Sequence, residues 1–112
     1  MGNVTNTEEI MSLLEKVKKL ISGKKFDFVP RRKNLQSLAK HGLTIKDAKD
    51  EILDLVTSNY YKGPKNDFDS PGEIWEFKKE IDGTLFYIKI KIAIECGTEI
   101  VKCIGFHDDD FA

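Results

Sequence analysis

The sequence has few of the features that identify a metal-bound or disulfide-bonded protein. Its 112 residues include two cysteines, Cys96 and Cys103, which form no disulfide framework. With His107 they give a C-x6-C-x3-H pattern, which has neither the spacing nor the four ligands of a structural zinc site. We therefore expect two reduced thiols that pack in the fold, and no metal or other cofactor.

Long apolar runs are also missing. No stretch approaches the eighteen or so apolar residues of a membrane-spanning helix. The N-terminal residues MGNVTNTEEIM contain neither a basic start nor an apolar segment of the kind found in secretory leaders. We therefore expect a cytoplasmic protein that does not bind membranes.

The net charge of −1 excludes a protein coated evenly with positive charge, but the charges are unevenly distributed. Residues 16–40 carry nine basic side chains and one acid, a local charge of +8, whereas the rest of the chain carries −9. The basic segment includes Arg31, Arg32 and Lys33. It could bind a polyanion such as RNA. Alternatively, its charges could keep the protein soluble and stabilise the negative C-terminal end of a helix dipole.

The clearest pattern is the alternation of apolar and polar residues between Glu73 and His107. Asp82-Gly83 and Gly97 separate three alternating runs, so the segment predicts a three-stranded antiparallel meander. The expected buried side chains of the first two runs are Trp75, Phe77, Ile81, Phe86, Ile88, Ile90, Ile92 and Ile94. In the third run, one face is predicted to carry Ile100, Lys102, Ile104 and Phe106. The opposite face is predicted to carry Val101, Cys103, Gly105 and His107.

The opposite face of this sheet collects titratable side chains. They are Glu76, Lys78, Tyr87, Lys89, Lys91 and His107. Such a face is most often simply solvated. It could instead supply the acids, bases and cations of an active site.

The N-terminal half predicts helices. We expect the first helix to begin at Thr7 as N-cap and to end at Gly23, a second helix over residues 34–41, and a third after Thr44. Residues 1–6 should be disordered, residues 26–29 extended, and residues 60–72 an irregular loop. The prediction is a single α+β domain over residues 1–112, with N-terminal helices packed on a C-terminal three- to four-stranded antiparallel sheet.

Several short strings resemble one known family. They are Asn59-Tyr60-Tyr61-Lys62, Ile74-Trp75, Gly83, Tyr87-Ile88-Lys89-Ile90 and Gly105-Phe106-His107. In this order and spacing, the run from Leu55 to His107 resembles the MqsR toxins of type II toxin–antitoxin systems, within the wider RelE/ParE-like group. Glu76 stands where the relatives have glutamine, and His107 where they have lysine.

The resemblance implies a metal-independent endoribonuclease that cuts mRNA and is neutralised by an antitoxin, expected to contain a helix-turn-helix. Carried over by position, the catalytic residues would be Lys62, Glu76, Tyr87 and His107. The cations expected to bind RNA are Lys89, Lys91, Arg31, Arg32 and Lys33. RNA cleavage without a metal needs a base, an acid and a cation at the phosphate, and these side chains can supply all three.

Two other functions fit the same sequence. The chain could be a non-catalytic inhibitor on this fold, such as a phage or mobile-element protein that blocks a nucleic-acid-processing enzyme. Its acidic Asp108-Asp109-Asp110 would then mimic nucleic acid. It could also be a ParE-like toxin that acts on gyrase.

Overall fold

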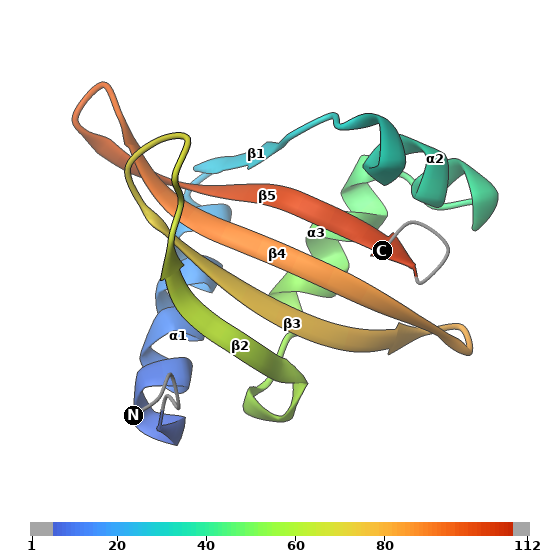
Figure 1. The fold of residues 1–112 in the computed structure, drawn as a ribbon, viewed down its shortest axis with the longest axis horizontal. Coiled ribbons are helices and arrows are strands. Elements are labelled where there is room, and N and C mark those ends of the chain that lie inside the picture. Colours follow the sequence, from blue (N-terminus) through green and yellow to red (C-terminus); the bar gives the residue numbers. More distant parts are fainter. Residues whose placement is uncertain (1–5, 109–112) are drawn as a thin grey trace.

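The computed structural model describes residues 6–108, which form three helices, one 3-10 turn and a five-stranded sheet (Figure 1). The helices are α1 (Thr7–Ser22), α2 (Arg32–Lys40) and α3 (Ile45–Leu53), and the turn is η1 (Thr57–Asn59). The strands are β1 (Phe26–Phe28), β2 (Tyr60–Asn66), β3 (Glu73–Ile81), β4 (Thr84–Glu95) and β5 (Thr98–Asp108). The predicted α+β class, with N-terminal helices and a C-terminal sheet, is confirmed.

The sheet is larger than the predicted three or four strands, and it is not wholly antiparallel. Its order is β1-β5-β4-β3-β2, and β1 pairs in parallel with β5. Residues 60–66, which we expected to lie in an irregular loop, form β2 at one edge. Pro64 is tolerated there because an edge strand leaves one row of N–H groups unpaired.

One face of the sheet is the core face, and α1 and α3 lie against it (Figure 1). The predicted apolar face of β3 and β4 is confirmed, because its side chains form part of the core. Buried core side chains on these strands are Trp75, Phe77, Ile81, Phe86, Ile88 and Ile90. Two residues of the same row depart from the prediction: Ile92 is only partly buried against the core, and Ile94 is 72% exposed. The core-facing row of β4 therefore runs beyond the helices that cover it.

The strict alternation predicted for β5 is wrong. Val101, Cys103 and Phe106 all contribute to the core. The register with β4 shifts between the Lys89–Gly105 pair and the Ile90–Cys103 pair, so Ile104 is an extra residue in β5. This β-bulge reverses the parity of the strand. Without it, His107 would share a face with Cys103 and point into the core.

A buried asparagine on α2 closes this bulge. Asn34 is fully buried, and its Nδ2 donates to the carbonyls of Val29 and Ile104, each at 3.2 Å. Its Oδ1 accepts from the backbone N–H of Phe106 at 3.0 Å. One turn later, Ser37 Oγ accepts from the N–H of Asp108 at 3.1 Å. Helix α2 thus holds the backbone on both sides of His107.

The helix boundaries also differ from the prediction at two points. The N-cap of α1 is Asn6, not Thr7, because the Asn6 side chain accepts from the N–H of Glu9. The expected disorder of residues 1–6 therefore fails at Asn6, and residues 1–5 lie outside the described part. Helix α2 begins at Arg32. Among residues 6–108, no helix has the length and apolar character required to cross a bilayer.

Candidate active site

The outer face of the sheet, opposite α1 and α3, carries two adjacent rows that consist of six polar side chains and one glycine. The register of β2, β3, β4 and β5 places Lys62, Glu76, Lys89 and Gly105 in one row. The neighbouring row contains Lys78, Tyr87 and His107. Neighbouring strands lie about 4.8 Å apart, so these side chains occupy one compact patch. We call these seven residues the polar grid.

His107 is the most enclosed ionisable side chain of the grid, at 4% exposed. Its Nδ1 lies 3.3 Å from the carbonyl oxygen of Asp108. A carbonyl can only accept, so the neutral ring carries its proton on Nδ1 and has a lone pair on Nε2. Burial, together with the charges of Lys33 and Lys89, lowers the pKa of His107 below its ordinary value. The imidazole is therefore neutral at pH 7 and can act as a base.

Aromatic rings connect His107 to the lysines of β3 and β2. The rings of Tyr87 and His107 lie with their centroids 6.1 Å apart. Lys78 Nζ lies 3.8 Å from the ring centre of Tyr61 and 5.3 Å from that of Tyr87. Lys62 Nζ also lies over the Tyr61 ring, 5.2 Å from its centre. These cation–π contacts hold positive charge at the face while leaving aromatic surface accessible.

The glycine in the grid makes room for Lys89. A Cβ at position 105 would stand 3.2–3.4 Å from Cβ, Cγ and Cδ of Lys89, so the lysine stem lies over the Gly105 backbone. Burial is the main reason that the pKa of Lys89 is lowered, and Lys65, Lys33 and Arg31 lower it further, whereas Glu76 raises it. Its ammonium group is consequently a stronger acid than that of an exposed lysine.

Glu76 is a buried carboxylate at the centre of the grid, at 6% exposed. Its Oε2 lies 2.9 Å from Lys65 Nζ on β2, but outside hydrogen-bonding geometry. This oxygen accepts no hydrogen bond from residues 6–108. A buried carboxylate with an unfilled acceptor is able to orient a donor group of a ligand.

The structure brings together most of the residues singled out from the sequence. Lys62, Glu76, Tyr87, Lys89 and His107 all belong to the grid. Arg31 and Lys33, at the start of α2, act electrostatically on Lys89, and Lys33 also acts on His107. Arg32 is exposed at the first position of α2.

Lys91 lies on the same face but has a different environment. It is 3% exposed, and its Nζ donates to Asp67 at 2.7 Å and to Ser70 Oγ at 2.5 Å. The ion pair with Lys91 is the main reason that the pKa of Asp67 is lowered. Lys91 therefore fastens the segment between β2 and β3 to the sheet, and its ammonium group is occupied.

Four residues of this region were not predicted from the sequence to belong to the site. Lys65 and Tyr61 lie in the segment that we expected to be a loop, where no strand register could be assigned. Asn34 and Ser37 are polar residues on a helix, and helical periodicity places such residues in solvent. Within residues 6–108, no three His, Cys, Asp or Glu side chains come together as metal ligands.

The fold and the grid define a class: a small α+β domain with a cationic sheet face that bears a neutral histidine, a tyrosine and a buried carboxylate. Within that class, residues 10–108 match the family described as the motility quorum-sensing regulator, toxin of MqsA. This match spans most of the 112 residues, so the chain belongs to the MqsR toxin family, the toxins of toxin–antitoxin pairs. No curated protein matches the sequence.

Proposed function

We propose that the chain is a metal-independent endoribonuclease that cleaves mRNA in the cytoplasm and is neutralised by a helix-turn-helix antitoxin. One observation carries the proposal: a neutral histidine and a lysine of lowered pKa lie on adjacent rows of one cationic face. A base, an acid and a cluster of cations are what RNA cleavage without a metal requires.

In this mechanism His107 is the base. Its Nε2 takes the proton of a ribose 2′-hydroxyl, and O2′ attacks the adjacent phosphorus. The P–O5′ bond breaks, and the leaving O5′ takes a proton from the ammonium group of Lys89. The products are a 2′,3′-cyclic phosphate and a 5′-hydroxyl, and solvent restores both protonation states.

The other residues bind and orient the RNA. Tyr87 supports the imidazole with its ring and donates from its hydroxyl to the phosphate. Lys62 and Lys78 hold the phosphate oxygens, while Arg31, Arg32 and Lys33 bind the RNA backbone on the other side of His107. Glu76 retains Lys65 at the face, and its charge raises the pKa of Lys89 against the lowering effect of burial. Tyr61, 44% exposed, offers a ring on which a base can stack.

The proposal is tested with purified protein and a single-stranded RNA labelled at its 5′ end, in buffer with EDTA. We expect cleavage by the wild type, a loss of at least a hundredfold in His107→Ala and in Lys89→Ala, and a smaller loss in Tyr87→Phe. Lys102→Ala is the matched control, because Lys102 lies on the same face but pairs with Glu95 and Asp27. Its cleavage rate should equal that of the wild type.

The other functions predict different results. Absence of cleavage with inhibition of gyrase would identify a ParE-like toxin. Absence of both, with no growth arrest on expression, would identify a binding module on this fold. Cleavage that is equal in the wild type and in His107→Ala would refute the proposed site.

A further inference from the structure

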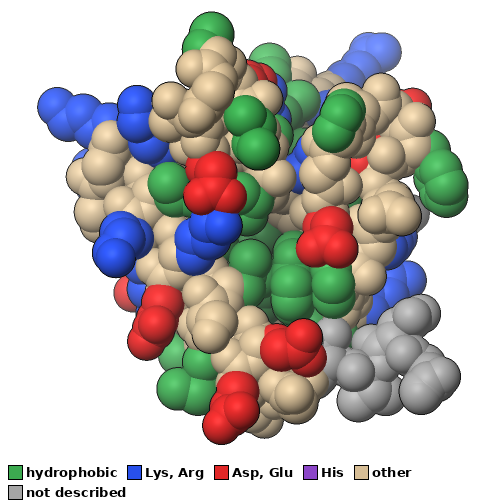
Figure 2. All heavy atoms as spheres, turned by 90° about the vertical axis from the view of Figure 1, so that its left-hand side faces the viewer, with side chains coloured by type: hydrophobic (Ala, Val, Ile, Leu, Met, Phe, Trp, Pro, Cys, Tyr) green, Lys and Arg blue, Asp and Glu red, His purple; other side chains and the backbone are tan. Residues whose placement is uncertain are grey.

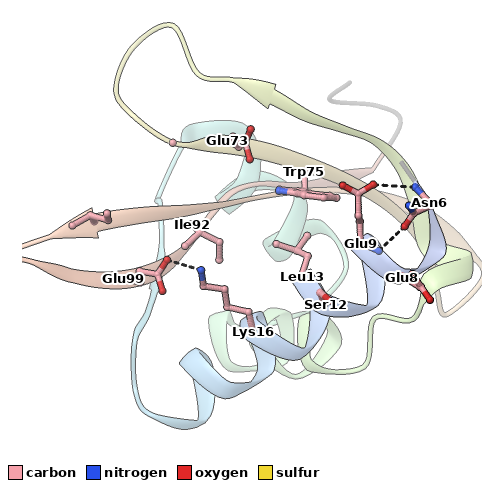
Figure 3. Close-up of a pocket in the computed structure, with 12 residues that line it drawn as sticks. Asn6, Glu8, Glu9, Ser12, Leu13, Lys16, Glu73, Trp75, Ile92 and Glu99 are labelled. Carbon is pink, nitrogen blue, oxygen red and sulfur yellow. Dashed lines mark hydrogen bonds and ion pairs between the residues drawn. The ribbon is translucent and has the colours of Figure 1, made fainter. Parts of the chain in front are cut away.

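A groove lies on the opposite side of the sheet from the polar grid, between α1 and the ends of β3, β4 and β5 (Figure 3). Its volume is about 640 Å³. Leu13 of α1, Trp75 of β3 and Ile92 of β4 point into it. The polar grid uses none of these residues, so the groove requires an explanation of its own.

The groove exists because the sheet is longer than its helical cover. Ile94 continues the core-facing row of β4 and also lines the groove, yet 72% of it is exposed. In a strand, side chains two residues apart share one face, so Ile94 lies in the core-facing row but is left largely exposed by the described helices. An apolar side chain of this size on an open face marks an interaction surface when other apolar residues adjoin it.

The rim of the groove is acidic. Glu8 and Glu9 of α1, Glu73 of β3 and Glu99 of β5 contribute carboxylates. The single lysine among the lining residues, Lys16, forms a 2.6 Å ion pair with Glu99, which leaves a net charge of −3 on the rim. In Figure 2 this side of the molecule shows apolar side chains in a hollow with acidic side chains around it. Such a rim repels RNA and attracts Lys and Arg.

Apolar floor and acidic rim together define the chemistry of the occupant. A suitable segment presents apolar side chains that cover Ile94, Trp75 and Leu13, and carries Lys or Arg beside them to meet the glutamates. A folded partner can supply such a segment as an amphipathic helix or as an extended strand.

We propose that this groove receives a basic, apolar segment of the antitoxin. The choice of partner rests on the proposed neutralisation by an antitoxin, while the choice of place rests on the groove itself. Because the groove and the polar grid lie on opposite faces, binding here leaves the grid uncovered. A segment docked in the groove therefore anchors the antitoxin, and contact with the RNA-binding face has to come from another part of it.

The test uses the full chain and the purified protein encoded by the gene that adjoins its own. Binding is measured by titration calorimetry for Ile94→Lys and Glu73→Lys, which place a cation in the floor and on the rim. Ile45→Lys and Asp54→Lys are the matched controls, since Ile45 is 46% exposed, Asp54 is exposed, and neither lines the groove. We expect at least tenfold weaker binding in each groove variant and unchanged binding in both controls.

RNA cleavage by the same variants separates this inference from the proposed function. Groove variants that cleave RNA normally but lose the antitoxin support the groove. Groove variants that bind as tightly as the wild type overturn it, whether or not the chain cleaves RNA. Failure of the wild type to bind the adjoining gene product overturns the choice of occupant. Loss of antitoxin binding in the groove variants of a chain that cuts no RNA would sustain the groove and refute the ribonuclease.

Discussion

Asn34 is the residue on which the position of His107 depends most. It donates to the carbonyls of Val29 and Ile104 and accepts from the N–H of Phe106, and the last two bonds tie α2 to β5. Asn34→Ala removes these bonds and leaves the Ile104 carbonyl and the Phe106 N–H at the bulge without a side-chain partner. Each buried group left unsatisfied costs about 1–3 kcal/mol, so we expect the two groups to cost about 2–6 kcal/mol together.

The assay is urea denaturation of Asn34→Ala beside two controls. Ser37→Ala removes a single hydrogen bond to Asp108 and should cost about 1 kcal/mol. Asn66→Ala changes an exposed asparagine on β2 and should leave stability within about 0.5 kcal/mol of the wild type. The pKa of His107, followed by NMR, should rise toward about 6.5 in Asn34→Ala as its burial is relaxed.

A cost below about 0.5 kcal/mol for Asn34→Ala would refute the reasoning, because it would mean that the bulge persists without its buried partner. A large cost with an unchanged pKa of His107 would show that Asn34 supports the fold but does not position the imidazole. Both results can be read from the same samples.

Three further predictions concern the fold and its pH dependence. Trp75→Ala should destabilise the fold by about 3–5 kcal/mol, because Trp75 is 9% exposed and packs edge-on against Tyr60; a midpoint of urea unfolding close to that of the wild type would contradict this. Gly63→Ala should cost at least about 2 kcal/mol, since Gly63 has a φ of +117° and an added Cβ would lie 2.7 Å from the Ile74 carbonyl oxygen. Gly97→Ala, with a φ of +75° and no atom within 4 Å, should cost less, and an equal cost would remove the steric argument. The pKa of His107 is lower in the folded chain than in the unfolded chain, so its contribution to stability is complete above pH about 6.5 and is lost as the pH falls toward the folded pKa. His107→Gln should therefore make the free energy of unfolding less dependent on pH in this range. An unchanged pH dependence would mean that other groups cause it.

The elements that follow local patterns could be predicted from the sequence. Strict alternation from Trp75 to Ile92 and the Asp82-Gly83 turn fixed the faces of β3 and β4, and the structure has the predicted hairpin between them. The capping box of α3 at Thr44 and Asp47 is likewise local, and it is present. In these segments each residue's environment depends on neighbours close in sequence.

The features that escaped prediction depend on contacts between distant residues. The parity of β5 reverses at Ile104 because Asn34, seventy positions earlier, satisfies the bulge. Strand β2 has Gly63 and Pro64 in its middle, which are typical of a turn, and it forms the edge of the sheet beside β3. Lys91 has the spacing of a surface lysine, and its burial follows from Asp67 and Ser70.

In the candidate site, too, some features follow from local sequence patterns and others depend on contacts between distant residues. Glu76, Tyr87 and Lys89 were placed on one face by alternation alone, and the pairing of β3 with β4 confirms that face. His107 was assigned to a polar face by an alternation that the bulge breaks, and the reversed parity is what places it beside Tyr87. Its tautomer follows from the Asp108 carbonyl, and its lowered pKa comes from burial and from the charges of Lys33 and Lys89, which only the folded chain brings close to the ring.

The most direct test of the proposed activity is the pH dependence of RNA cleavage by the wild type, His107→Ala and Lys102→Ala in the presence of EDTA. We predict that wild type and Lys102→Ala cleave equally and leave 2′,3′-cyclic phosphate ends. Their activity should fall as the pH drops below about 6.5 toward the lowered pKa of His107, and should fall again at alkaline pH as Lys89 loses its proton, while His107→Ala is inactive throughout. Cleavage by His107→Ala at the wild-type rate, or cleavage by the wild type that EDTA abolishes, would contradict a metal-independent reaction with His107 as its base.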